Sequence, residues 1–140
     1  MKTVVSIPTH RGRVLPGPLV QRFGTIWTVR GFLLLQIATL LSMGSIHFGL
    51  LIGGYDHRAA GATELIIAAV LLAALLLTWM PAPGSRRPAT AAQSFGILGV
   101  LGGFLTIATG IGPRTTLDLT LNAALLLTLI AGLAITLRKP

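Results

Sequence analysis

Long apolar stretches separated by short polar segments dominate the sequence after residue 30. Four such stretches cover residues 31–54, 59–80, 94–112 and 117–137. Each has the length that an α-helix needs to cross the hydrocarbon core of a bilayer, roughly 17–25 residues. The segments between them are short, so consecutive helices should run antiparallel. The pattern predicts an all-α fold, an up-down bundle of four transmembrane helices.

The first 30 residues follow a different pattern and form a predicted basic arm. Glycine and proline interrupt its first half, which disfavours regular structure there. From Pro18 on, apolar and polar residues alternate with helical spacing, and proline suits the start of a helix. We therefore expect an amphipathic helix in the headgroup region, anchored by Trp27, before a membrane domain over residues 31–140. An unstructured basic tail is the alternative.

Composition supports the membrane assignment. Hydrophobic residues make up 53% of the chain and charged residues 10%, against about 25% charged residues in an ordinary soluble domain. Lipid is the solvent that tolerates so much exposed apolar surface. The apolar stretch after the arm is too long for a signal peptide, so we expect it to remain as a helix. There is no cysteine, which excludes disulfides and thiolate metal ligands.

The charges are distributed unevenly and predict the orientation. Nine of the eleven basic residues lie in the arm, at positions 86–87 and at positions 138–139. Arg58 and Arg114 lie on the other side with all three acidic residues. By the positive-inside rule, both termini should be cytoplasmic in a multi-pass protein of a bacterial inner membrane. The net charge of +8 then serves attraction to anionic headgroups rather than nucleic-acid binding, because the basic residues flank apolar stretches.

Small residues predict where helices approach closely. Ser45, Gly49 and Gly53 recur every four residues in the first apolar stretch, and Gly99 and Gly103 form a GxxxG pair in the third. Membrane helices associate through such small faces, because apolar side chains gain little by leaving lipid for one another. These faces predict tight packing within the bundle or, alternatively, a homodimer.

Rare polar residues gather near the predicted outer surface. The candidate polar cluster consists of His47, Asp56, His57, Glu64, Arg114, Asp118 and Asn122. Ionisable groups in a membrane helix are costly and need partners. His47 and Glu64 are the two placed most deeply in lipid.

Three interpretations of this cluster stay open. Glu64 or Asp118 could pair with Arg114 or Arg58 and join the outer loops. Imidazole and carboxylate ligands from His47, His57, Asp56 and Glu64 could instead bind a divalent metal ion, although no compact motif such as HExxH is present. His47 and His57 could also ligate a haem or line a path for protons or quinone.

Two stretches resemble known small membrane proteins. GILGVLGGFLTIATGIGPRTTLDLTLN and SIHFGLLIGGYDHRAAGATE resemble stretches of small bacterial four-helix membrane proteins to which no activity is assigned. The helix number and the glycine-rich helices are also similar to those of DoxX-type proteins. Neither resemblance implies a catalytic residue. The two halves also resemble each other, with Arg58 aligned to Arg114, which a tandem repeat of a two-helix unit would explain.

No sequence motif predicts an enzyme. The chain lacks a phosphate-binding loop, a dinucleotide-binding glycine pattern and a nucleophile elbow. We therefore expect a non-catalytic membrane protein without a cofactor, an accessory subunit of a larger membrane complex. The alternative is a protein that binds a small molecule, an ion or a cofactor through the candidate polar cluster.

Overall fold

Four helices account for most of the chain. The computed structural model describes residues 18–80, 86–112 and 114–138, with side chains from residue 26 onward. The helices are α1 (Pro18–His47), α2 (Arg58–Leu77), α3 (Arg87–Thr109) and α4 (Thr116–Leu137). Each helix is long and apolar enough to cross a membrane, which confirms the predicted all-α fold with four candidate spans. The first 17 residues of the basic arm and the last two residues of the chain lie outside the described residues.

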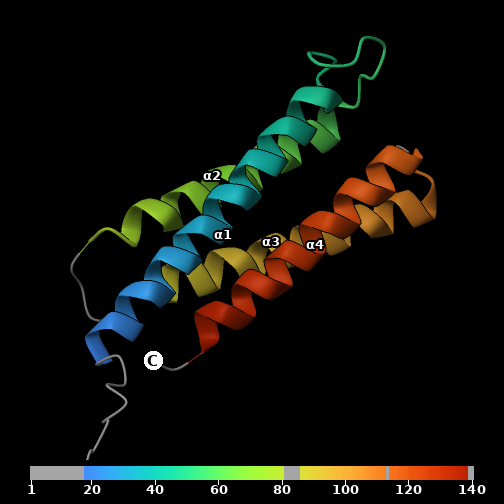
Figure 1. The fold of residues 1–140 in the computed structure, drawn as a ribbon. Coiled ribbons are helices and arrows are strands. Elements are labelled where there is room, and N and C mark those ends of the chain that lie inside the picture. The colour runs from blue at the N-terminus through green and yellow to red at the C-terminus, as the bar shows by residue number, and fades with distance from the viewer. Residues whose placement is uncertain (1–17, 81–85, 113, 139–140) are drawn as a thin grey trace, which may run out of the picture.

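The helices form a ring in chain order. α1 packs against α2 and α4, and α3 packs against the same two helices. Figure 1 shows that the start of α1 and the end of α4 lie at one end of the bundle, as an up-down connection requires. We call it the basic end, because Arg30, Arg86 and Arg138 lie there. The opposite end, here the acidic end, carries the corner at residues 48–57, the α3–α4 corner and all three acidic residues.

The surface of the bundle is apolar along its length. Large side chains point outward, and Leu98 and Leu127 are both 69% exposed. The inward faces meet in a core that includes Leu33, Leu40, Leu71, Leu125 and Leu129. Surface of this kind needs lipid around it, so the packing agrees with the composition in indicating a multi-pass membrane protein.

The first helix ends earlier than its apolar composition predicts. α1 stops at His47 instead of residue 54, because Gly49 takes a left-handed conformation with φ of 70°. The N–H of Leu50 donates to Ser45 O and the N–H of Gly49 to Ile46 O, both at 2.9 Å. This pair of bonds is the Schellman motif that terminates many helices. Gly49 and Gly53 therefore lie in the corner, and their predicted role in a helix–helix contact is wrong.

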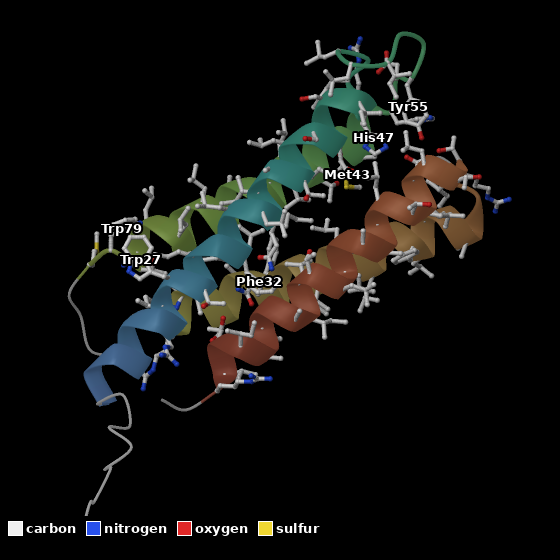
Figure 2. The ribbon with its side chains drawn as sticks, in the orientation of Figure 1. Trp27, Phe32, Met43, His47, Tyr55 and Trp79 are labelled. Carbon is white, nitrogen blue, oxygen red and sulfur yellow. The ribbon has the colours of Figure 1, made fainter. Side chains whose placement is uncertain are left out.

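The segment from Pro18 is continuous with the first span in one helix, so a separate interfacial helix is not confirmed. Within this helix, Arg30 donates through Nε to Thr78 Oγ1 at 3.1 Å and through Nη2 to Thr78 O at 2.7 Å. Its guanidinium carbon lies 3.9 Å from the ring centroid of Trp79 and 4.9 Å from that of Trp27. Figure 2 shows the two tryptophans together at the basic end. Arg30 thus joins α1 to the carboxyl end of α2.

The glycines of α3 pack inside the bundle. A Cβ on Gly99 would lie 2.5 Å from Ile67 Cδ1 of α2, and one on Gly96 would lie 3.0 Å from Leu129 Cδ2 of α4. The small residues of α3 therefore allow close contacts with α2 and α4 of the same chain, as the prediction of packing within the bundle requires. Gly103 has looser surroundings, since its Cβ would meet only Asn122 Oδ1 at 3.6 Å.

Candidate functional site

Three polar side chains from three helices meet inside the acidic end. His47 is the last residue of α1, Glu64 lies in the second turn of α2, and Asp118 lies in the first turn of α4. His47 Nδ1 lies 2.7 Å from Glu64 Oε2, and His47 Nε2 lies 3.0 Å from Asp118 Oδ1. The three residues are only 2%, 8% and 2% exposed, respectively. We call them the carboxylate–histidine triad.

The geometry of the triad requires a shared proton. Each contact between a ring nitrogen and a carboxylate oxygen needs one hydrogen between the two atoms. A neutral imidazole supplies one N–H, so the second contact needs either an imidazolium or a protonated carboxyl group. In both cases His47, Glu64 and Asp118 together carry a net charge of −1. With the proton removed, a bare ring nitrogen would face a carboxylate across a hydrogen-bond distance.

Asp118 is held firmly by the start of α4. Thr115 caps this helix: its side chain accepts from the Asp118 N–H, while Asp118 Oδ2 accepts from the Thr115 N–H, both at 3.2 Å. The Thr115 hydroxyl also donates to Oδ2 at 2.6 Å. A carboxylate in the first helical turn is stabilised by the helix dipole as well. The start of α4 therefore holds the Asp118 carboxyl group in one position.

Tyr55 covers this carboxylate from the corner at residues 48–57. Its hydroxyl donates to Asp118 Oδ2 and lies 2.7 Å from Thr115 Oγ1. Burial raises the pKa of the Tyr55 hydroxyl above its ordinary value, and the hydrogen bond to Asp118 raises it further. Its ring stacks on His47 at 5.6 Å between centroids, and Figure 2 shows both side chains at the acidic end.

His57 closes the corner without joining the triad. Its backbone N–H donates to His47 O at 2.8 Å, and its ring packs edge to face on Tyr55 at 5.3 Å between centroids. The ring centroid of His57 lies 6.2 Å from that of His47. His57 thus borders the triad through ring contacts, and the main chain sets its position.

The arginines have partners other than the ones we predicted from the sequence. Arg58 donates to Asp56 Oδ1 at 3.2 Å in an exposed pair. Arg114 donates to Ile107 O at 2.9 Å and to the neighbouring carbonyl of α3 at 3.1 Å, which satisfies the end of that helix. Of the three interpretations left open from the sequence, the pairing of Glu64 or Asp118 with these arginines is not the one found, because both carboxylates contact His47.

Asn122 also lies beside the triad, one turn after Asp118 on α4. Its side-chain amide donates to Asp118 O at 2.9 Å. Of the seven predicted cluster residues, the structure thus brings His47, Glu64 and Asp118 into direct contact and places His57 and Asn122 next to them. The other two, Asp56 and Arg114, stay at the surface of the corners.

The triad does not have the geometry of a metal or haem site. Among the described residues, no group of three or more His, Asp or Glu side chains has an arrangement that could hold a metal ion. Both nitrogens of His47 are hydrogen-bonded to carboxylates, so neither points at an iron or zinc position. The donor set is that of a buried proton-sharing group.

A cavity of about 590 Å³ opens beside the triad, between α2, α3 and α4. His47, Glu64 and Asn122 line one part of it, and most of the remaining wall is apolar, with Ile67 and Leu125 among its residues. Gly99, Gly102 and Gly103 of α3 also line it. Because glycine has no side chain, this face of α3 leaves the space open.

Tyr55 and Thr115 are the two residues of this site that the sequence prediction missed. The pattern Thr115-x-x-Asp118 is a capping box, and it could have indicated that Asp118 starts a helix. Tyr55 is the single tyrosine of the chain, but its contact with Asp118 joins residues 63 positions apart, which no local pattern reveals.

The arrangement combines a group that holds a proton with a cavity large enough for a small molecule. Such a pairing can bind a ligand, exchange a proton with it, or stabilise the bundle. Comparisons of the chain with models of protein families, with curated proteins and with solved structures found no match.

Proposed function

We propose that this protein binds a small molecule in the cavity at its acidic end, with Glu64 as the polar contact. The observation that supports this proposal is the presence of a buried carboxylate in the wall of a mostly apolar cavity. Ligand sites commonly have volumes of about 300–1,000 Å³ and an apolar wall with a few polar groups. Ionisable residues inside membrane helices are costly and are retained mostly for function.

Glu64 is the member of the triad that is available to a ligand. Within the part of the chain that the structure describes, its side chain has one hydrogen-bond partner, His47, reached through Oε2. The other oxygen, Oε1, is left for a partner in the cavity. Asp118, in contrast, uses both oxygens in contacts with His47, Tyr55 and Thr115.

The orientation that we propose follows from the charges. Both termini lie in the cytoplasm of a bacterium, and the cavity lies near the outer surface of its inner membrane. The excess of basic residues in the arm, at positions 86–87 and at positions 138–139 supports this orientation. The basic end then faces anionic headgroups of the inner leaflet.

The cavity can be filled by a substitution that leaves the rest of the bundle in place. Gly103→Leu would put a side chain into the space that Gly103 lines. Gly31→Leu is the matched control, because a Cβ on Gly31 meets nothing within 4 Å. The probes are neutral, cationic and anionic benzene derivatives of similar size. The measurement is the midpoint of unfolding in detergent, and the fluorescence of Trp27 and Trp79 is the signal that monitors unfolding.

We expect at least one probe to raise the midpoint of the wild-type protein and of Gly31→Leu, with no effect on Gly103→Leu. A ligand at about 100 times its Kd stabilises the folded state by about 2.7 kcal/mol. Equal shifts in all three proteins would indicate partition into the detergent or binding elsewhere. That result, or the absence of any shift, would contradict the proposed binding function.

The alternative proposal is an accessory subunit of a membrane complex. The small size of the chain supports it, and so does the triad, since three helices joined by His47 form a rigid unit without any ligand. Purification from native membranes tests this alternative. A complex with a defined partner protein supports it, whereas a chain that purifies alone counts against it.

A further inference from the structure

We infer that the ligand of this cavity is a monovalent organic cation, and that it binds to Glu64 in exchange for the shared proton of the carboxylate–histidine triad. This inference rests on the proposed binding function and adds the chemical class of the ligand. Three observations support it: the hydrogen bonds of the triad, the larger number of contacts that hold Asp118 than hold Glu64, and the mostly apolar wall of the cavity.

The charge of the triad favours a cation. Two carboxylates and one imidazolium, whose two N–H groups donate to them, carry a net charge of −1 inside the bundle. The charge is the same if one of the two protons lies on a carboxyl group. His47 is the one basic side chain that contacts Glu64 among the described residues. A ligand with one positive charge can therefore replace the proton without changing the total charge of the site, and a neutral or anionic ligand cannot.

Glu64 is the carboxylate that can turn toward the ligand. Asp118 is fixed by the helix cap of Thr115 and by the Tyr55 hydroxyl. Glu64 is held by His47 alone and already lines the cavity. Breaking the contact between Glu64 Oε2 and His47 Nδ1 frees the side chain without disturbing the start of α4.

The groups around Glu64 come from each neighbouring element. α1 supplies His47, and α4 supplies Asn122 and also Asp118, which lies on the far side of the His47 ring from Glu64. α3 contributes Thr106 but no charged group to the cavity wall. His57 and Arg58 line the cavity at the corner. The side chain of Arg58 is 80% exposed, so its charge is screened by water.

The exchange conserves both protons and charge. The cation enters and Glu64 turns from His47 Nδ1 to pair with it. The imidazolium then loses the Nδ1 proton to solvent and keeps the Nε2–H that donates to Asp118. One positive charge has entered and one proton has left, so the site again carries a net charge of −1. Protonation of the triad reverses the process and expels the cation.

The size and the wall of the cavity favour an organic cation over an inorganic one. A volume of about 590 Å³ far exceeds that of a sodium ion, whose binding requires several oxygen ligands at short range. Apolar side chains such as Ile67, Ile107 and Leu125 form much of the wall. They suit the hydrocarbon part of an amphiphilic ammonium compound.

The test uses benzyltrimethylammonium as the probe, because its charge is permanent and does not change with pH. Neopentylbenzene, which has the same shape without the charge, is the neutral control, and sodium chloride is the inorganic control. Binding to the full-length protein in detergent is measured over a series of pH values. Release of protons is measured in weakly buffered solution with an indicator dye.

We expect the association constant of the cation to rise about tenfold per pH unit on the acidic side of the titration. Binding should release one proton per cation, and sodium should not compete. Glu64→Gln should lose both the preference for the cation and the proton release, while it still binds neopentylbenzene. Asp56→Asn, which removes an exposed carboxylate at the same end, should behave as the wild-type protein.

Three results would overturn the inference. Cation affinity that is independent of pH would exclude the exchange, equal binding of the two benzene probes would exclude a preference for charge, and competition by sodium would exclude an organic ligand. Each of these results leaves the cavity as a binding site. The proposed function itself would be contradicted by a different result: no probe binds, or the probes bind equally well to the wild-type protein and to Gly103→Leu.

Discussion

At the scale of single residues, His47 links the ends of three helices. It is buried and contacts one carboxylate with each ring nitrogen. The energetic value of such a group lies less in the attraction itself than in the penalty that follows when one partner is lost. Glu64 has His47 as its one hydrogen-bond donor among the described residues, and Oδ1 of Asp118 contacts the same ring.

Replacement of His47 by leucine should therefore be strongly destabilising. His47→Leu leaves two buried carboxylates without their shared donor, and we expect a loss of about 3–5 kcal/mol in the free energy of unfolding. Glu64→Gln should cost less, because the amide oxygen can still accept from His47. Reversible unfolding in mixed detergent micelles provides the measurement.

Asp56→Asn is the control for this experiment. Its carboxylate is exposed and pairs only with the exposed Arg58, so we expect a change within about 0.5 kcal/mol. A His47→Leu protein as stable as Asp56→Asn would show that the triad does not hold the acidic end together.

The titration of Tyr55 is a second prediction at this scale. Burial, followed by its hydrogen bond to Asp118, raises the pKa of this hydroxyl, so the folded state favours the neutral phenol. The resulting stabilisation is present below the unfolded pKa of about 10 and is lost as the pH rises from there through the folded pKa. Because the chain has a single tyrosine, the ultraviolet absorbance of tyrosinate reports on Tyr55 alone. Titration at or below the value of the unfolded protein would contradict the buried contact.

At the scale of helices, contacts at glycine position the triad. A Cβ on Gly61 of α2 would lie 2.9 Å from Phe48 Cε2 and 3.2 Å from His47 Cβ. The absence of a side chain at this position lets α2 approach the end of α1 closely. The distance between the two helices in turn places Glu64 within reach of the imidazole.

Gly61→Leu should therefore separate α1 from α2 at the acidic end. The added side chain overlaps the ring of Phe48, and overpacking of this kind costs about 1–3 kcal/mol. We also expect the pKa of Tyr55 to move back toward its ordinary value, since displacement of His47 opens the corner to water. Gly53→Leu is the matched control, because a Cβ there meets nothing within 4 Å. Equal unfolding midpoints for the two variants would contradict the close contact.

At the scale of the whole molecule, an apolar surface and an asymmetric charge distribution determine how the bundle sits in lipid. The outward faces are hydrocarbon, and the acidic residues lie at the end opposite Arg30, Arg86 and Arg138. The proposed orientation depends on this asymmetry, because basic residues near the ends of spans are retained on the cytoplasmic side.

Single cysteines can test the orientation directly, since the chain has none of its own. Gly53→Cys places a thiol in the exposed corner of the acidic end, and Arg138→Cys places one at the basic end. A maleimide that cannot cross membranes should label Gly53→Cys in intact cells and Arg138→Cys only after the cells are permeabilised. The reverse labelling pattern would contradict cytoplasmic termini.

The sequence alone was sufficient to predict the number of helices and the end of the bundle at which the candidate polar cluster lies. The second and fourth helices begin and end within three residues of the predicted apolar stretches, because hydrocarbon length and composition are local properties. The end of α1 was predicted too late, since residues after Gly49 are apolar but follow a left-handed glycine. Composition does not report the dihedral angle that stops a helix.

What the sequence by itself determined was the set of rare polar residues and the end of the bundle at which they lie, since both follow from the order of apolar and charged residues along the chain. The tertiary structure decided which of them touch. Glu64 and Asp118 are 54 positions apart, and both reach His47 only because α1 packs against both α2 and α4. The cavity likewise depends on how three helices pack around the glycines of α3. Hydrogen bonds and cavities are properties of distances between helices, and no single helix carries that information.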